Sequence, residues 1–106
     1  MSAEELGRAV DLLVAQVGHW TAPRWAAPAA ARTTSRGDLV HHLVQEIADR
    51  CADAEGEPRR PVPRLDNDLA LPDQLRVVAA DLAAADPGAD VLAAAADRVR
   101  ATRATL

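Results

Sequence analysis

The residues best suited to metal or acid–base chemistry lie in the first half of the chain. His19, His41 and His42 are the only histidines, and Asp38, His42 and Glu46 recur at a four-residue spacing. On a helix this spacing places the side chains of Asp38, His42 and Glu46 in one row. A zinc or iron site needs several such ligands that converge. Because the row lies opposite an apolar stripe, we interpret it as solvent-exposed and expect neither a metal nor another cofactor.

One short string within this region resembles a known family. GDLVHHL, residues 37–43, is similar to the Asp-Leu-Val-x-His-Leu string of actinobacterial members of the DinB-like four-helix-bundle family, which includes mycothiol-dependent isomerases. The resemblance implies a metal-binding role for His42. The second histidine that the family carries on another helix has no counterpart, because no histidine follows His42. We therefore assign no family from this string.

Cys51 is the only cysteine, so it has no partner for a disulfide within the chain. A chain without a disulfide framework suits a reducing cytoplasm. Cys51 falls on the apolar stripe of a predicted helix, where a free cysteine usually packs as a small hydrophobic residue. No arrangement of cysteine, histidine and asparagine accompanies it, and we predict no catalytic residue.

A basic cluster, Arg59, Arg60 and Arg64, lies in the segment PRRPVPR. It could bind a phosphate, an acidic peptide or a nucleic acid, and Pro58-x-x-Pro61 matches the minimal proline-rich ligand pattern. Four acidic residues flank the cluster and offset its field: Glu55, Glu57, Asp66 and Asp68. The other interpretation is therefore a stiff connection with solvated arginines.

Trp20 and Trp25 are the only aromatic residues apart from the histidines, since the chain has no Phe and no Tyr. A tryptophan buries about 150–250 Å² in a core, but tryptophan is also enriched where partners bind. Trp20 continues the apolar row of the first predicted helix, so we predict that it is buried. Trp25 lies between Pro23 and Pro28, outside any such row, and we predict that it packs at the edge of the bundle, partly exposed. Both tryptophans remain candidate binding residues.

Composition narrows the class of protein. The chain has 106 residues and a formal net charge of −4, which fits one domain over residues 1–106 and argues against a nucleic-acid partner. All twelve basic residues are arginine, which we interpret as the codon bias of a GC-rich bacterial genome. The N-terminal segment is acidic, unlike a signal peptide, and no stretch reaches the roughly 20 apolar residues of a membrane span. We expect a cytoplasmic protein with no membrane partner.

The helices that must position these residues follow from apolar periodicity. The first predicted helix ends near Gly18. The second runs from about residue 36 to 54 and ends near Gly56, and its apolar stripe passes through Leu43, Ile47 and Cys51. Residues 55–70 contain three prolines within six residues, which favours an extended path.

The second half of the chain predicts two more helices. Leu65 and Leu69 are expected to attach the extended segment to the bundle. The third helix begins near Leu71 or Pro72, with Pro72 at the first helical position. Asp86 and Pro87 are expected to start the fourth helix as its N-cap and first residue. The short connection predicts that the third and fourth helices form an antiparallel hairpin.

The sequence thus predicts an all-α fold, a compact four-helix arrangement with two long irregular connections. We interpret the chain as a non-enzymatic interaction protein or a small regulatory protein. Its expected partner is another protein or a second copy of itself, because a small core gains from an added interface. The alternative is a helical bundle that binds a small molecule or a metal near Trp20, Trp25, His19 and His41.

Overall fold

The computed structural model describes residues 2–30 and 33–106. Four long helices make up most of the described chain: α1 (Ser2–Val17), α3 (Arg36–Glu55), α4 (Leu71–Ala84) and α5 (Ala89–Thr105). The connection after α1 contains a short helix, α2 (Ala22–Ala26), and a single 3-10 turn, η1 (Asp68–Ala70), precedes α4. No strand forms among the described residues. The prediction of an all-α fold with four helices is confirmed.

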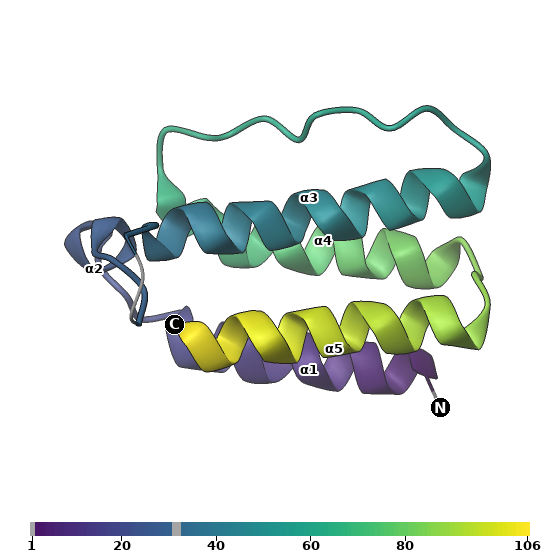
Figure 1. Ribbon diagram of the computed structural model, residues 1–106, viewed down its shortest axis with the longest axis horizontal. Coiled ribbons are helices and arrows are strands. Elements are labelled where there is room, and N and C mark those ends of the chain that lie inside the picture. The colour runs from purple at the N-terminus through teal and green to yellow at the C-terminus, as the bar shows by residue number, and fades with distance from the viewer. Residues whose placement is uncertain (1, 31–32) are drawn as a thin grey trace.

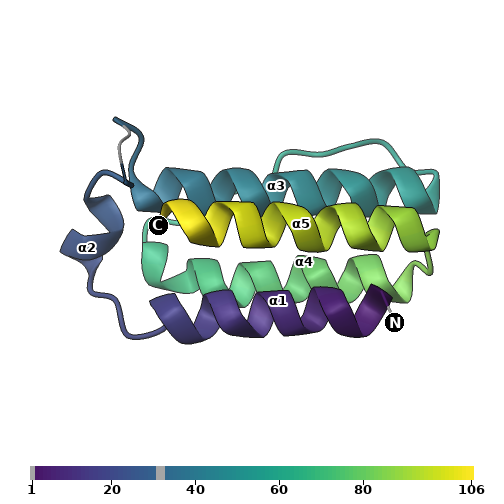
Figure 2. The ribbon, with the colours of Figure 1, turned by 60° about the horizontal axis from the view of Figure 1, so that its bottom comes forward.

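The four long helices form a bundle in two pairs (Figures 1 and 2). α1 packs chiefly against α5, and α3 packs chiefly against α4. Both pairs are parallel, because α1 and α5 run toward the end that carries α2 while α3 and α4 run away from it (Figure 1). A chain reaches this arrangement only if it crosses back along the bundle between α3 and α4, and the long proline-rich connection does so.

The expected hairpin of the last two helices is wrong in its packing. α4 and α5 do run in opposite directions, but each packs on α1 and α3 rather than on the other. The sequence suggested a hairpin because the connection between them is short. In the bundle α4 lies beside α3, and α5 lies beside α1. The last two helices therefore occupy diagonally opposite positions in the bundle.

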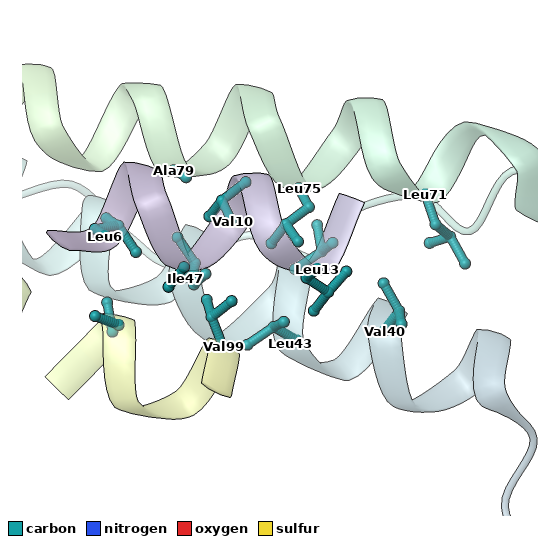
Figure 3. Close-up of a cluster of buried hydrophobic side chains, with 14 of the residues drawn as sticks. Leu6, Val10, Leu13, Val40, Leu43, Ile47, Leu71, Leu75, Ala79 and Val99 are labelled. Atoms are coloured by element: carbon teal, nitrogen blue, oxygen red, sulfur yellow. The ribbon is translucent and has the colours of Figure 1, made fainter. Parts of the chain in front are cut away.

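The core lies along the axis between the four helices (Figure 3). Leucine, valine and isoleucine from α1, α3 and α4 fill most of it, while α5 contributes Leu92, Val99 and two alanines, Ala95 and Ala96. Alanine has little side chain to hold two helices apart, which lets α5 approach α1 closely. The alanine-rich sequence therefore shapes the bundle by allowing close approach rather than by adding apolar bulk.

Helix ends follow local signals in some places only. Ser35 caps α3 by accepting a hydrogen bond from the Asp38 backbone N–H at 3.0 Å. Gly56 ends α3 in the left-handed conformation, with φ 69°, which glycine adopts without steric cost. The predicted start of the last helix is wrong, because Asp86 itself takes a positive φ of 51° and Gly88 occupies the N-cap. α5 therefore begins two residues later than an Asp86 cap and a Pro87 first turn require.

Candidate functional site

The proline-rich strap, residues 57–67, runs along the outside of the bundle over α3 and α4 (Figure 1). Gln45 on α3 holds its centre, since its Oε1 accepts from the Val62 N–H at 2.7 Å and its Nε2 donates to the Arg60 carbonyl at 3.0 Å. His41 Nε2 donates to the Val62 carbonyl at 3.1 Å, and Gln74 on α4 donates to the Pro63 carbonyl at 3.3 Å. Side chains of two helices thus satisfy four backbone groups at the centre of the strap, where no sheet or helix ladder does so.

The C-terminal end of the strap is fixed by an ion-pair clasp that Arg64 forms with Asp38 and Asp68. Arg64 bonds Asp38 of α3 at 2.7 Å and Asp68 of η1 at 3.0 Å. The hydrogen bond from Arg64 lowers the pKa of Asp38 below its usual value. Gly37 lies directly beneath this clasp, where a Cβ atom would collide with the side chains of Arg64 and Asp68. The glycine in GDLVHHL therefore gives the Arg64 pair room to close onto α3.

The structure does not bring the predicted basic cluster together. Arg59 pairs with Asp53 near the end of α3 at 2.7 Å, and Arg64 pairs at the other end of the strap. Arg60 lies between them with an exposed side chain. Its contact with the fold is the hydrogen bond that its backbone carbonyl accepts from Gln45. The three arginines are spread along an extended segment, and two of them are neutralised by carboxylates of the chain itself.

Leu65 and Leu69 do not attach the strap to the bundle, and that prediction is wrong. They are 45% and 49% exposed, and Val77 on α4 is 59% exposed. Val62 packs against the core instead. Sequence reasoning missed Val62 and Gln45, although a lone valine between Pro61 and Pro63 was a usable signal.

An apolar groove opens between the strap and α4. Its lining residues come from the strap, η1 and α4: Val62, Leu65, Ala70, Asp73, Gln74, Val77 and Val78. Large apolar side chains usually avoid such exposure together, and clusters of them mark contact sites. Asp73 is the only charged residue in this set, and it is exposed.

The two tryptophans close the end of the bundle that carries α2. Trp20 is buried as predicted, but Trp25 is 0% exposed, so its predicted partial exposure is wrong. The reason is α2, whose short turn of helix directs the second indole inward. The two rings meet edge to face, with centroids 5.0 Å apart, a geometry that aromatic pairs prefer.

Two arginines cover Trp20 at this end. The Arg24 and Arg36 guanidinium carbons lie 4.9 Å and 5.4 Å from the centroid of the Trp20 ring. Among the described residues, Trp20 Nε1, Trp25 Nε1 and Arg36 Nε are buried and have no hydrogen-bond partner. The Trp20 end therefore combines cations with unsatisfied N–H donors.

The three histidines do not form a site in the described chain. His19 and His42 are exposed, and His41 is committed to the strap. No group of three histidine, cysteine, aspartate or glutamate side chains is arranged to hold a metal ion within residues 2–30 and 33–106. The exposure of His42 gives no support to the metal-binding role implied by the resemblance of residues 37–43.

Cys51 is buried, and its thiol donates to Glu55 Oε1 at 2.9 Å. Burial, with a further contribution from that hydrogen bond, raises the pKa of the thiol to about 11. A groove of about 550 Å³ between the strap and the helices passes beside it. Because the thiolate is the nucleophilic form, Cys51 is poorly suited to attack a substrate at neutral pH.

No protein-family model, no curated protein and no solved structure matches this chain. None of the described helices is long and apolar enough to cross a lipid bilayer.

Proposed function

We propose that this chain is a non-enzymatic interaction protein whose docking surface is the apolar groove between the strap and α4. The observation that supports this most directly is the shared exposure of Leu65 and Val77, which line the groove from the strap and from α4. Large apolar side chains on neighbouring elements lose contact with water when a partner covers them, and that loss favours binding. The single cysteine, which has no partner for a disulfide within the chain, supports a reducing compartment such as the cytoplasm as the place where this occurs.

The occupant we propose is a short amphipathic segment of another protein. The groove has seven lining residues, whereas a stable interface between two folded proteins uses about 20–30 residues on each side. A segment with two or three apolar side chains fits this size. Asp73 within the groove and Asp66 on the strap are exposed carboxylates, so a basic residue beside the apolar ones completes the match.

The strap preorganises the groove for binding. Its backbone is fixed by Gln45, His41 and Gln74, and its prolines restrict the unbound chain. A surface that is already ordered loses less conformational entropy when a partner binds. This provides affinity from a small contact area.

A peptide-display selection tests the proposal. A library of amphipathic helical peptides is selected on the wild-type protein, and selected peptides are measured against Val77→Asp, Asp73→Asn and Leu12→Asp. Leu12 is a matched control, because it is similarly exposed on α1 and lies outside the groove. We expect peptides rich in Leu and Arg that lose at least tenfold affinity for Val77→Asp, weaken for Asp73→Asn and bind Leu12→Asp normally.

Two results would contradict this occupant. Selected peptides that bind Val77→Asp as tightly as the wild type would remove the groove from consideration. A wild-type dimer in light scattering that Val77→Asp converts to a monomer would show that a second copy of the chain covers the groove.

A further inference from the structure

The end of the bundle at α2 has an unusual balance of charge. Between Asp11 and Asp38 the sequence contains no acidic residue, but it contains His19 and three arginines: Arg24, Arg32 and Arg36. The protein as a whole has a net charge of −4. This segment therefore carries positive charge in an acidic molecule, although Arg32 lies outside the described residues. Two carboxylates on elements that adjoin α2, Asp38 of α3 and Asp68 of η1, are paired with Arg64.

Two of these arginines lie against the same tryptophan ring, and neither has an ion-pair partner among the described residues. Arg24 and Arg36 lie within 5.4 Å of the same Trp20 centroid, and Arg36 Nη1 donates to the Arg24 carbonyl at 3.3 Å. None of the ion pairs within the described residues includes either arginine. The Trp20 ring attracts both cations, but it does not neutralise their repulsion.

Two neutral indole donors, and one N–H of the Arg36 guanidinium itself, lack acceptors in the described part of this end of the bundle. The indole N–H groups of Trp20 and Trp25 and the Nε–H of Arg36 are buried and find no acceptor among the described residues. Buried polar groups are nearly always paired, so unpartnered N–H groups on two adjoining tryptophans need an explanation. Each indole leaves the positive end of its N–H dipole uncompensated, and Trp20 is also the ring that both guanidinium groups contact.

We propose that Arg24 and Arg36 bind a phosphate group at the Trp20 end of the bundle. A phosphate monoester carries about −1.5 to −2 charges at neutral pH, which matches two guanidinium groups better than the single charge of a carboxylate. Guanidinium presents paired N–H donors that fit phosphate oxygens. Arg24 is exposed and Arg36 is half-buried, so the anion approaches from solvent while the buried donors contribute through their field.

The Trp20 end and the apolar groove share no residue, so this proposal stands or fails separately from the proposed function.

Intrinsic fluorescence gives a local readout, because Trp20 and Trp25 are the only tryptophans and no tyrosine is present. The full chain is titrated with inorganic phosphate at constant ionic strength, and with acetate as a monovalent comparison. We expect a saturable fluorescence change with phosphate and at least tenfold weaker binding of acetate. We expect at least a tenfold loss of phosphate affinity in Arg24→Gln and in Arg36→Gln, and none in Arg8→Gln, which removes an exposed arginine from α1.

Circular dichroism of each variant shows whether a loss of phosphate affinity comes from a loss of helical structure. Arg36 takes part in a hydrogen bond of the fold, so the exposed Arg24→Gln variant is decisive if Arg36→Gln loses helicity. Titration with O-phosphoserine and with glycerol 3-phosphate distinguishes a phosphorylated protein from a small metabolite as the source, and saturation by either supports the site. An unsaturable response to phosphate, equal affinity for acetate, or unchanged affinity in Arg24→Gln would overturn the proposal.

Discussion

Ile47 and His42 lie on the same helix, but one is buried in the core and the other is exposed to solvent. Ile47→Ala leaves a cavity among close-packed side chains, and we expect it to lower the free energy of unfolding by about 2–5 kcal/mol. His42→Ala removes an exposed ring, and we expect a change within about 0.5 kcal/mol. Urea unfolding followed by circular dichroism measures both. Equal losses in the two variants would show that the face of α3 is assigned wrongly.

Cys51 predicts a specific response to alkaline pH. Its thiol has a pKa of about 11 in the fold, raised from 9.0 by burial and by Glu55. The unfolded chain therefore loses this proton first, and stability falls as pH rises from 9 toward 11. The sequence has no lysine or tyrosine, so few other groups titrate in this window.

We expect this fall to be at most roughly 2–3 kcal/mol, and to be absent in Cys51→Ala. Urea midpoints of the two proteins at pH 8, 9, 10 and 11 provide the measurement. At pH 8 iodoacetamide should modify folded wild-type protein much more slowly than the denatured chain. Rapid alkylation of the folded protein would mean that the thiol is accessible and its pKa is not raised.

At the scale of elements, the strap depends on few contacts. Gln45→Ala removes the acceptor for the Val62 N–H and the donor to the Arg60 carbonyl, so the strap should open more often. We expect trypsin to cut after Arg59 and Arg64 several-fold faster, while the helices remain resistant. Mass spectrometry of timed digests locates the cuts.

Gln16→Ala on α1 is the matched control, because it removes a partly exposed glutamine far along the chain from the strap. Its digestion should match the wild type. If Gln45→Ala also matched the wild type, the two hydrogen bonds of Gln45 would have no role in holding the strap.

The sequence predicted elements well where their signals are local. α3 was predicted to within a residue, since an apolar stripe, Ser35 and Gly56 lie within the helix or next to it. The burial of Trp25 was missed because α2 has only five residues and its inward direction depends on packing against the bundle. The attachment of the strap by Val62 rather than Leu65 was missed for the same reason. Its hydrogen-bond partner, Gln45, lies 17 residues earlier.

The candidate sites were predictable only in part. The sequence identified Trp20, Trp25 and the arginines as residue types that bind, but it grouped Arg59, Arg60 and Arg64 because they are neighbours in the chain. An extended strap separates neighbours, whereas folding brings Arg24 and Arg36 onto one ring. The exposure of Val77 also depended on where the strap crosses α4, which periodicity does not encode.

At the scale of the whole molecule, an apolar core accounts for the bundle without a bound ion. The buried residues of the described core are aliphatic side chains, the two tryptophans and Cys51. We therefore expect a strong chelator such as EDTA to leave the far-ultraviolet circular dichroism and the melting temperature unchanged. A loss of helicity on chelation, reversed by added zinc, would contradict this expectation.

The pairing of α1 with α5 has a consequence during protein synthesis. The first helix of the chain emerges from the ribosome seconds before its main partner, at about 5–20 residues per second. During that interval its apolar face, with Leu6, Val10 and Leu13, has no α5 to cover it. Contacts between such distant segments also slow folding. We therefore expect the apolar face of nascent α1 to be open to contacts with other molecules until α5 has been translated.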